Sequence, residues 1–173
     1  MMKSMAIFRR LVYSVVLVLA VASFARGGPP VETSVDSEVS LYFADVESLK
    51  LSIEKRTISQ TENIVEQIKL VVSELTKGPA TELAPTIPAG TSVREVFLDE
   101  KGCAYVDFSA ALSENHPGGT TSELVTIASI VNTLTKNFPE AVQKVRIIID
   151  GKEAETIAGH IDISRPIFPF EIE

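Results

Sequence analysis

The stretch that decides the fold is residues 120–149, TTSELVTIASIVNTLTKNFPEAVQKVRIII. Its first part predicts an amphipathic helix, because apolar residues recur at helical spacing. Thr120 and Glu123 stand at the spacing of a capping box, and Phe138-Pro139 ends the helix. Residues 145–149 are apolar except for Arg146, which predicts a central strand buried on both faces. The helical stripe that we expect to be buried consists of Leu124, Ile127, Ala128, Val131 and Leu134.

Hairpins flank this stretch on both sides. Upstream, the apolar runs at residues 92–98 and 102–108 are joined by Asp-Glu-Lys-Gly, a tight-turn composition. Downstream, Asp150-Gly151 predicts a turn into a shorter strand near residues 155–157. The tail IDISRPIFPF carries two prolines, so we expect it to lie across a sheet edge.

Two strands open the globular part. VSLYFAD, residues 39–45, is rich in β-branched and aromatic residues, and Val39, Leu41 and Phe43 would share one face. Downstream, Leu49, Leu51 and Ile53 alternate with polar residues, which predicts a half-buried strand with these three side chains facing the core.

A first helix follows these strands. The apolar stripe over residues 64–75 fits one helical face. Ser59 or Thr61 can cap its start, and Lys77-Gly78-Pro79 ends it. Residues 79–90 contain three prolines and predict a loop.

The order of elements is strand, strand, helix, hairpin, helix, hairpin. Two helices of this length can cover one face of a sheet of five or six strands. The pattern therefore predicts an α+β fold, a two-layer sandwich with a mixed or antiparallel sheet and two helices on one face.

Residues 1–25 predict an export segment. A basic start precedes the uncharged run LVYSVVLVLAVASFA, which suits a signal peptide and is short for a membrane span. Ser23 and Ala25 fit a cleavage site; the alternative is an uncleaved anchor in the inner membrane, the only membrane contact that we expect. Both alternatives place the rest of the chain outside the cytoplasm, in the periplasm or another extracytoplasmic space. Residues 26–38, RGGPPVETSVDSE, predict a flexible tether, and residues 39–173 a single domain.

Composition excludes several classes of function. The net charge of −7 disfavours nucleic acid as a partner, because an acidic surface repels phosphates. One cysteine and two histidines supply little material for a metal or redox centre, so we expect neither a cofactor nor a metal.

Six phrases, in order, resemble the GerMN domain family, which is linked in some bacteria to sporulation and germination. They are LYFAD, ELTKGP, IPAGTSVREVFL, GCAYVDFS, GGTTSELVTIASIVNTLTKNFPEAVQKVRIIIDG and ETIAGHIDISRPI, spanning residues 41–167. The resemblance implies a secreted or lipid-anchored protein with a fold similar to the ring-building motif of spore-envelope channels. It implies a role at the cell wall and supplies no catalytic residue.

Two side chains of the second hairpin are candidates for ligand binding. Tyr105 and Asp107 alternate with Cys103, so all three point to one side of their strand. An acidic group among apolar neighbours suits a binding carboxylate. The alternative is an aspartate at a strand end that accepts hydrogen bonds from the following backbone.

His160 and Asp162 form a second candidate pair. They could contact a ligand or a divalent metal, although two scattered ligands are too few for a closed metal site. The alternative is a bend at Gly159-His160 with the imidazole bonded to nearby backbone. A thiol nucleophile, Cys103 with His116 or His160 as base, is the weakest pattern, and we assign no catalytic residue.

Three hypotheses for function follow, in order of preference. The first is a non-enzymatic envelope module that acts by self-association or by docking on an envelope protein. The second is a domain that binds a small ligand or a peptidoglycan fragment through aromatic side chains such as Tyr42 and Tyr105. The third is an envelope hydrolase.

Overall fold

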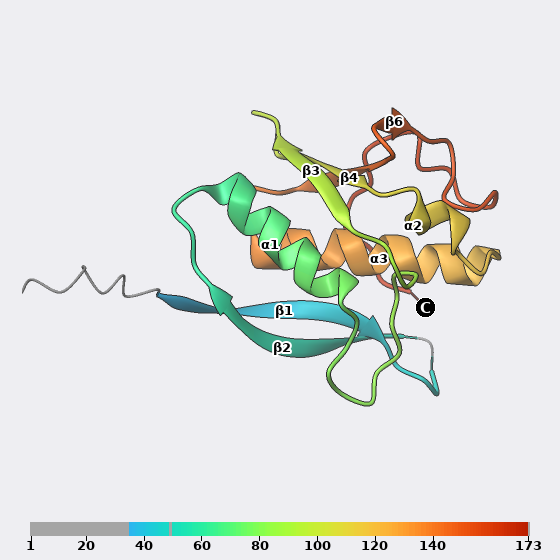
Figure 1. The fold of residues 1–173 in the computed structure, drawn as a ribbon, viewed down its shortest axis with the longest axis horizontal. Helices are drawn as coiled ribbons and strands as arrows, with labels where there is room; N and C mark the ends of the chain where they lie inside the picture. Colours follow the sequence, from blue (N-terminus) through green and yellow to red (C-terminus); the bar gives the residue numbers. More distant parts are fainter. Residues whose placement is uncertain (1–34, 49, 173) are drawn as a thin grey trace, which may run out of the picture. The chain divides into compact units, whose positions relative to one another are not determined.

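Helix α3 (Thr120–Asn137) contacts both sheets and the first helix of the fold (Figure 1). The computed structural model describes residues 35–48 and 50–172. The predicted export segment and residues 26–34 of the predicted tether lie outside these described residues. Among the described residues, no helix has both the length and the apolar character that crossing a bilayer requires.

The first two strands form a hairpin that is a sheet of its own. β1 (Asp36–Ala44) pairs antiparallel with β2 (Leu51–Ser59) along its whole length. β1 begins at Asp36, three residues before the predicted start of the domain. Val39, Leu41 and Phe43 are buried on one face, as the alternation predicted.

The predicted inward face of β2 is wrong. Glu54 and Ile58 are buried, whereas Ile53 is 51% exposed and Leu51 is half-buried. Leu49 lies outside the described residues. The side chains alternate as predicted, but the residues expected to face the core face outward, and their neighbours face inward. The reason is that the buried Glu54 carboxylate accepts hydrogen bonds from donors on the inner face.

Helix α1 (Ile64–Thr76) begins at a residue that the sequence analysis did not select. The Oδ1 atom of Asn63 accepts the backbone N–H of Val65 at 2.9 Å and caps the helix. The predicted caps are wrong: Ser59 belongs to β2, and the Thr61 hydroxyl donates to the carbonyl of Asn63. The helix ends as predicted.

The second sheet has the strand order β3-β4-β5-β6. β3 (Val93–Leu98) and β4 (Cys103–Phe108) form the predicted hairpin, and β5 (Lys144–Ile149) runs parallel to β4 as the second of the two inner strands. β6 (Lys152–Glu153) is shorter and earlier than the predicted strand at 155–157.

A tight turn and a helical crossover connect the strands of this sheet, and the tail pairs with one of them. Asp150 and Gly151 both have positive φ, which the tight turn between β5 and β6 requires. The short helix α2 (Ala111–Glu114) lies in the crossover from β4 to α3. The tail crosses a sheet edge as predicted: Ile167 exchanges two backbone hydrogen bonds with Val145, of 2.8 and 2.9 Å.

A polar stripe on α3 separates the two sheets. The Asn137 side chain bonds both backbone groups of Ser40, accepting its N–H at 2.9 Å and donating to its carbonyl at 2.7 Å. The Thr133 hydroxyl accepts the Tyr42 N–H at 3.1 Å, and the Ser129 hydroxyl donates to the Tyr42 carbonyl at 2.6 Å. The helix thus occupies the edge of β1 where another strand would pair.

The α+β prediction is confirmed, with six strands and mixed pairing. The difference lies in their division into sheets of two and four strands instead of one. The physical reason is the polar stripe, which satisfies the outer backbone groups of β1 without a strand.

Candidate functional site

A groove lies beside the outer face of the β1–β2 hairpin. We call it the hairpin groove; its volume is about 510 Å³. Its walls come from the hairpin, from α3 and from the C-terminal tail. The residues that line it are Tyr42, Lys50, Leu51, Ile53, Asn132, Lys136, Pro169, Phe170, Glu171 and Ile172.

The tail wall of the groove is fixed by one amide side chain. Asn132 of α3 donates through Nδ2 to the carbonyl of Phe170 at 2.8 Å, and its Oδ1 accepts the Phe170 N–H at 3.3 Å. The Asn132 amide thus bonds both backbone groups of Phe170, as a residue of a neighbouring strand would, and holds the tail against the helix. The groove therefore has two ordered walls in addition to the hairpin.

The lining of the groove combines apolar surface with charge. Tyr42, Ile53 and Phe170 supply apolar area, Lys50 and Lys136 supply cations, and Glu171 supplies a carboxylate. Burial, aided by the charge of Glu171, raises the pKa of the Tyr42 phenol. The phenol is therefore neutral at physiological pH and can donate a hydrogen bond to a bound group.

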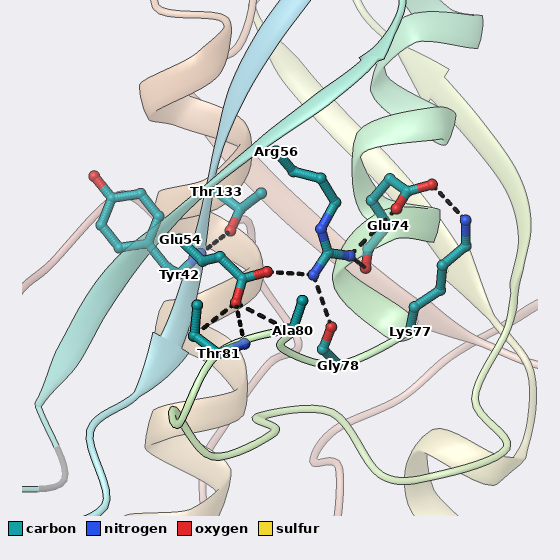
Figure 2. A network of polar contacts seen from close by, with 9 residues as sticks. All are labelled: Tyr42, Glu54, Arg56, Glu74, Lys77, Gly78, Ala80, Thr81 and Thr133. Atoms are coloured by element: carbon teal, nitrogen blue, oxygen red, sulfur yellow. Dashed lines mark hydrogen bonds and ion pairs between the residues drawn. The ribbon is translucent and has the colours of Figure 1, made fainter.

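The inner face of the hairpin carries an ionic network, shown in Figure 2. Arg56 pairs with Glu54 and lies 3.2 Å from the Glu74 carboxylate; it also donates to the carbonyls of Glu74 and Gly78, each at 3.0 Å. Tyr42 points away from this network, toward the outer face. The network therefore anchors the hairpin to α1 and the loop that follows it, and leaves the groove side free.

The Glu54 carboxylate also fixes the loop after α1. Its Oε2 atom accepts the N–H groups of Ala80 and Thr81 at 2.9 and 3.0 Å, and the Thr81 hydroxyl at 2.7 Å (Figure 2). Burial opposes ionisation of Glu54, but the hydrogen bonds from Thr81, Arg56 and the loop outweigh it and lower the pKa. Glu54 and Arg56 are thus structural, whereas Lys55 between them is exposed and pairs with Glu38 at 2.6 Å.

A second buried carboxylate lies at the start of α3. Glu123 does not form the predicted capping box: Gly119 caps the helix without a side-chain bond. The fully buried Glu123 carboxylate accepts the backbone N–H groups of His160 and Ile161 at 3.0 and 3.1 Å, and its Oε1 lies 2.8 Å from His160 Nδ1. Burial opposes its ionisation, but these bonds outweigh burial and lower its pKa.

The hydrogen bonds of His116 fix the tautomer of its neutral ring. Nδ1 accepts the N–H of Gly118 at 3.0 Å, so the proton is on Nε2, which donates to the Thr126 hydroxyl at 3.1 Å. That hydroxyl donates in turn to the carbonyl of Thr86 at 2.6 Å. Both ring nitrogens are engaged, and burial lowers the pKa of His116.

The predicted ligand-binding residues of β4 lie outside the hairpin groove. Asp107 accepts the N–H of Gly151 at 2.9 Å, and its carboxylate lies 3.1 Å from Arg94 Nε. Tyr105 places its hydroxyl 3.5 Å from Asp99, beside Cys103. Burial raises the pKa of the Cys103 thiol, which disfavours the reactive thiolate.

The other predicted pair is divided between two local structures. His160 contacts Glu123, as described above, while Asp162 accepts the N–H of Ser164 at 2.7 Å. The structure therefore does not bring Asp107, Tyr105, His160 and Asp162 into one site. Within residues 35–48 and 50–172, no three His, Cys, Asp or Glu residues are grouped closely enough to hold a metal ion.

Most residues of the groove carry no recognisable sequence signal. The alternation predicts that Ile53 faces the core, and Lys50, Lys136 and Phe170 belong to no motif. Ile53 and Glu54 are adjacent in one strand and must face opposite sides, but no local pattern shows which of the two faces the core. Phe170 and Lys136 join the site only through tertiary packing.

The fold is similar to those of solved structures. A Clostridium perfringens protein described as a lipoprotein is 24% identical, with a TM-score of 0.56, over 77% of this chain and 87% of that one. The tandem GerMN domains of the sporulation protein GerM from Bacillus subtilis are 22% identical, with a TM-score of 0.63, over 76% of this chain and 46% of that one. The first GerMN domain alone is 23% identical, with a TM-score of 0.57, over 76% and 97%. At these identities the likeness establishes the shared fold.

Sequence comparison gives a family but no individual relative. No curated protein matches the chain. The Germane family, described as "Sporulation and spore germination", matches residues 40–155, more than half of the chain. The matched span runs from within β1 to the loop after β6. It includes the groove residues of the hairpin and of α3, but not those of the C-terminal tail. The chain therefore belongs to the Germane family, to which the GerMN-like phrases of its sequence also pointed.

Proposed function

We propose that the chain is an exported module of the cell envelope that acts by contact, without catalysis. It would associate with itself or dock on an envelope protein, in a process linked to sporulation or germination. The family description and the similarity to a sporulation protein and to a protein described as a lipoprotein support this proposal.

The hairpin groove is the observation that carries the proposal. It is open and ordered, and it presents the exposed side chain of Ile53 beside Tyr42 and Phe170. Exposed apolar surface rimmed by charge is typical of a docking site. The ionic network on the opposite face of the hairpin holds this surface in place, so binding would need little reorganisation.

The bonding of the reactive side chains also supports a non-catalytic role. The Cys103 thiol has a raised pKa, and the rings of His116 and His160 contact Thr126 and Glu123. Replacing Cys103, His116, Asp107 and His160 in turn by alanine should leave the biological activity intact wherever the variant folds. Loss of activity in a variant of wild-type stability would support the hydrolase hypothesis instead.

Photo-crosslinking in the host tests the docking surface. A photoreactive amino acid at position 53 should capture an envelope protein or a second copy of the chain. The same amino acid at Glu100, an exposed turn residue between β3 and β4, is the matched control and should capture neither. Equal labelling at both positions, or recovery of the chain in the cytosolic fraction, would contradict the proposal.

A second candidate function is binding of a peptidoglycan fragment. The groove favours it through two aromatic residues, Tyr42 and Phe170, and through Lys50 and Lys136, which suit a carboxylate. Titration with purified muropeptides should then shift the NMR signals of groove residues. Shifts confined to the outer face of β4, around Tyr105, would place the ligand elsewhere.

A further inference from the structure

The bend between α2 and α3, residues 116–119, is held by one side-chain hydrogen bond. The N–H of Gly118 donates to Nδ1 of His116 at 3.0 Å. Among the described residues, this is the only hydrogen bond that reaches the backbone of residues 117 and 118. Gly118 and Gly119 both have positive φ, and a Cβ atom at either would lie in open space. Packing around these two glycines therefore contributes little to holding the bend.

The ends of the bend are fixed by other bonds. On the α2 side, Asn115 donates through Nδ2 to the carbonyl of Ala89 at 2.9 Å. On the α3 side, the N–H of Glu123 donates to the carbonyl of Gly119 at 3.0 Å, in the first turn of the helix. None of these donors and acceptors is a titratable group. The bend is therefore a short segment that can open while both of its neighbours stay folded.

The two ring nitrogens of His116 respond differently to protonation. The hydroxyl of Thr126 gives its proton to the carbonyl of Thr86, so it accepts a proton from Nε2. Nε2 bears a proton in both the neutral and the cationic ring, and this bond survives protonation. Nδ1 accepts from Gly118 and is the atom that takes the added proton. Two N–H groups then face each other, and the bond that holds the bend is lost.

His160 is the contrasting histidine of this region. Its Nδ1 lies 2.8 Å from the carboxylate of Glu123, which only accepts, so Nδ1 bears a proton in the neutral ring as well. The added proton goes to Nε2, which bonds to no side chain or backbone group of the described residues, on a ring that is 43% exposed. Protonation of His160 therefore breaks no hydrogen bond.

We propose that His116 is a pH switch: its neutral ring holds the bend at residues 116–119 closed, and protonation of Nδ1 in mild acid opens it. The opening is local, because the bonds at Asn115 and at the start of α3 do not titrate. The switch is a property of the fold and does not rest on the docking function proposed above. Its exposure to acid in the host rests on the proposed export.

The groups that face His116 determine where it titrates. Burial is the largest influence and lowers the pKa of His116; the charge of Glu123 on α3 raises this pKa, and the charge of His160 in the loop after β6 lowers it. The bend should therefore open below the ordinary histidine value of about pH 6.5. Glu123, whose pKa lies below the ordinary 4.5, stays ionised at that point and keeps its bonds to the N–H groups of His160 and Ile161.

NMR on the full chain in mild detergent, between about pH 7.5 and about pH 5.0, tests the switch. The ¹⁵N shift of Nδ1 should report protonation of His116. The protection factor of the Gly118 amide, which corrects for the pH dependence of intrinsic exchange, should fall about tenfold with the same midpoint, as the loss of one hydrogen bond predicts. The amides of His160 and Ile161 should keep their protection, because their acceptor is Glu123.

His116→Asn is the matched variant. An asparagine side chain accepts the N–H two residues along the chain and does not titrate, so Gly118 should stay protected throughout the pH range. His116→Ala removes the acceptor and should leave Gly118 unprotected at every pH. His160→Asn removes a charge that opposes protonation of His116, and it should raise the midpoint of the Gly118 transition.

Four results would overturn the switch. They are a His116 ring that stays neutral down to pH 5.0, protonation of the ring without loss of protection at Gly118, equal loss at His160 and Ile161, and loss at Gly118 in His116→Asn. The third would show general acid unfolding, and the fourth would assign the effect to another group. Crosslinking at position 53 tests docking separately and is independent of all four.

Discussion

The two strands of the first hairpin have opposite surroundings. The outward backbone groups of β1 at Ser40 and Tyr42 are bonded by side chains of α3, and Ala44 exchanges two backbone hydrogen bonds with Ala84, of 3.2 and 2.7 Å. The outward groups of β2 have no strand partner among the described residues. β2 is held instead from its inner face, by the ionic network of Glu54 and Arg56.

A two-stranded sheet can persist beside a larger one when other elements support both of its strands. A hairpin alone is marginal in water, so it must gain stability from what packs against it. Here α3 and Ala84 bond the outer edge of β1, and the ionic network of Glu54 and Arg56 holds the inner face of β2. The outer edge of β2 is left without a strand partner among the described residues.

Removing the anchor of β2 should have the largest effect. Glu54→Ala leaves the half-buried Arg56 without its nearest carboxylate and the N–H groups of Ala80 and Thr81 without an acceptor. We expect the free energy of unfolding to fall by about 3–5 kcal/mol. Urea denaturation measures it, and the neighbouring Lys55→Ala should stay within about 0.5 kcal/mol of the wild type. Similar losses in both variants would show that the two faces of β2 are held alike.

Opening the closed edge of β1 should cost less. Asn137→Ala removes the partner of both backbone groups of Ser40, and we expect a loss of about 2–4 kcal/mol in the free energy of unfolding. Amide exchange at Ser40 should accelerate, which distinguishes local opening from general destabilisation. Lys136→Ala, adjacent on the helix and directed to the groove, is the control. Unchanged exchange at Ser40 would contradict the edge function of α3.

Acid should weaken the anchors by a smaller amount. The pKa values of Glu54 and Glu123 are below the ordinary 4.5, so the unfolded chain binds protons more readily than the folded one. Their contribution to stability is therefore complete above about pH 4.5 and is lost as the pH falls through the lower folded values. The lowered pKa of His116, caused mainly by burial of its ring, acts in the same direction below about pH 6.5.

Urea midpoints at pH 7.5, 5.5 and 4.0 measure this dependence. The midpoint should fall at each step toward acid. Glu54→Gln should flatten the lower step, and His116→Gln the upper one. A midpoint that rises toward acid would mean that these groups are more easily protonated in the fold than in the unfolded chain.

A proline on the open edge should have the smallest effect. Thr57→Pro removes an N–H that points away from β1, so no hydrogen bond within the hairpin is lost. We expect a change below about 1 kcal/mol in the free energy of unfolding, measured by urea denaturation. Ile58→Pro, one position along, removes a bond to β1 and should unfold the hairpin. Equal stability of the two variants would refute the assigned parity.

Periodicity predicted the type of nearly every element, because helical and alternating spacings are local properties. It could not predict which face of β2 is buried, since the donors to Glu54 come from Ala80 and Thr81, far along the chain. The capping-box spacing at Glu123 was misleading for the same reason: residues 160 and 161 supply stronger donors. In both cases, hydrogen-bond donors distant in the sequence determine where the glutamate side chain lies.

The division into two sheets did leave a trace in the sequence. Thr126, Ser129, Thr133 and Asn137 recur at helical spacing on a helix whose residues 125–135 are all buried. A buried polar stripe of this kind must bond to backbone or to other side chains. The candidate site left a weaker trace, because Phe170 reaches the groove through Asn132 and no short-range pattern records that contact.

Where α3 bonds to the edge of β1, the spacing of the helix side chains nearly matches the spacing of the strand's outward backbone groups. Four residues of helix advance about 6.0 Å, and two residues of strand about 6.7 Å. The steps agree well enough for neighbouring rungs at Asn137 and Thr133, but the offset grows with each repeat. By Ala44 the bonding has passed from the helix to Ala84. A helix can therefore stand in for a strand over only a few rungs, which limits how long such a hairpin can grow before it needs a true neighbour.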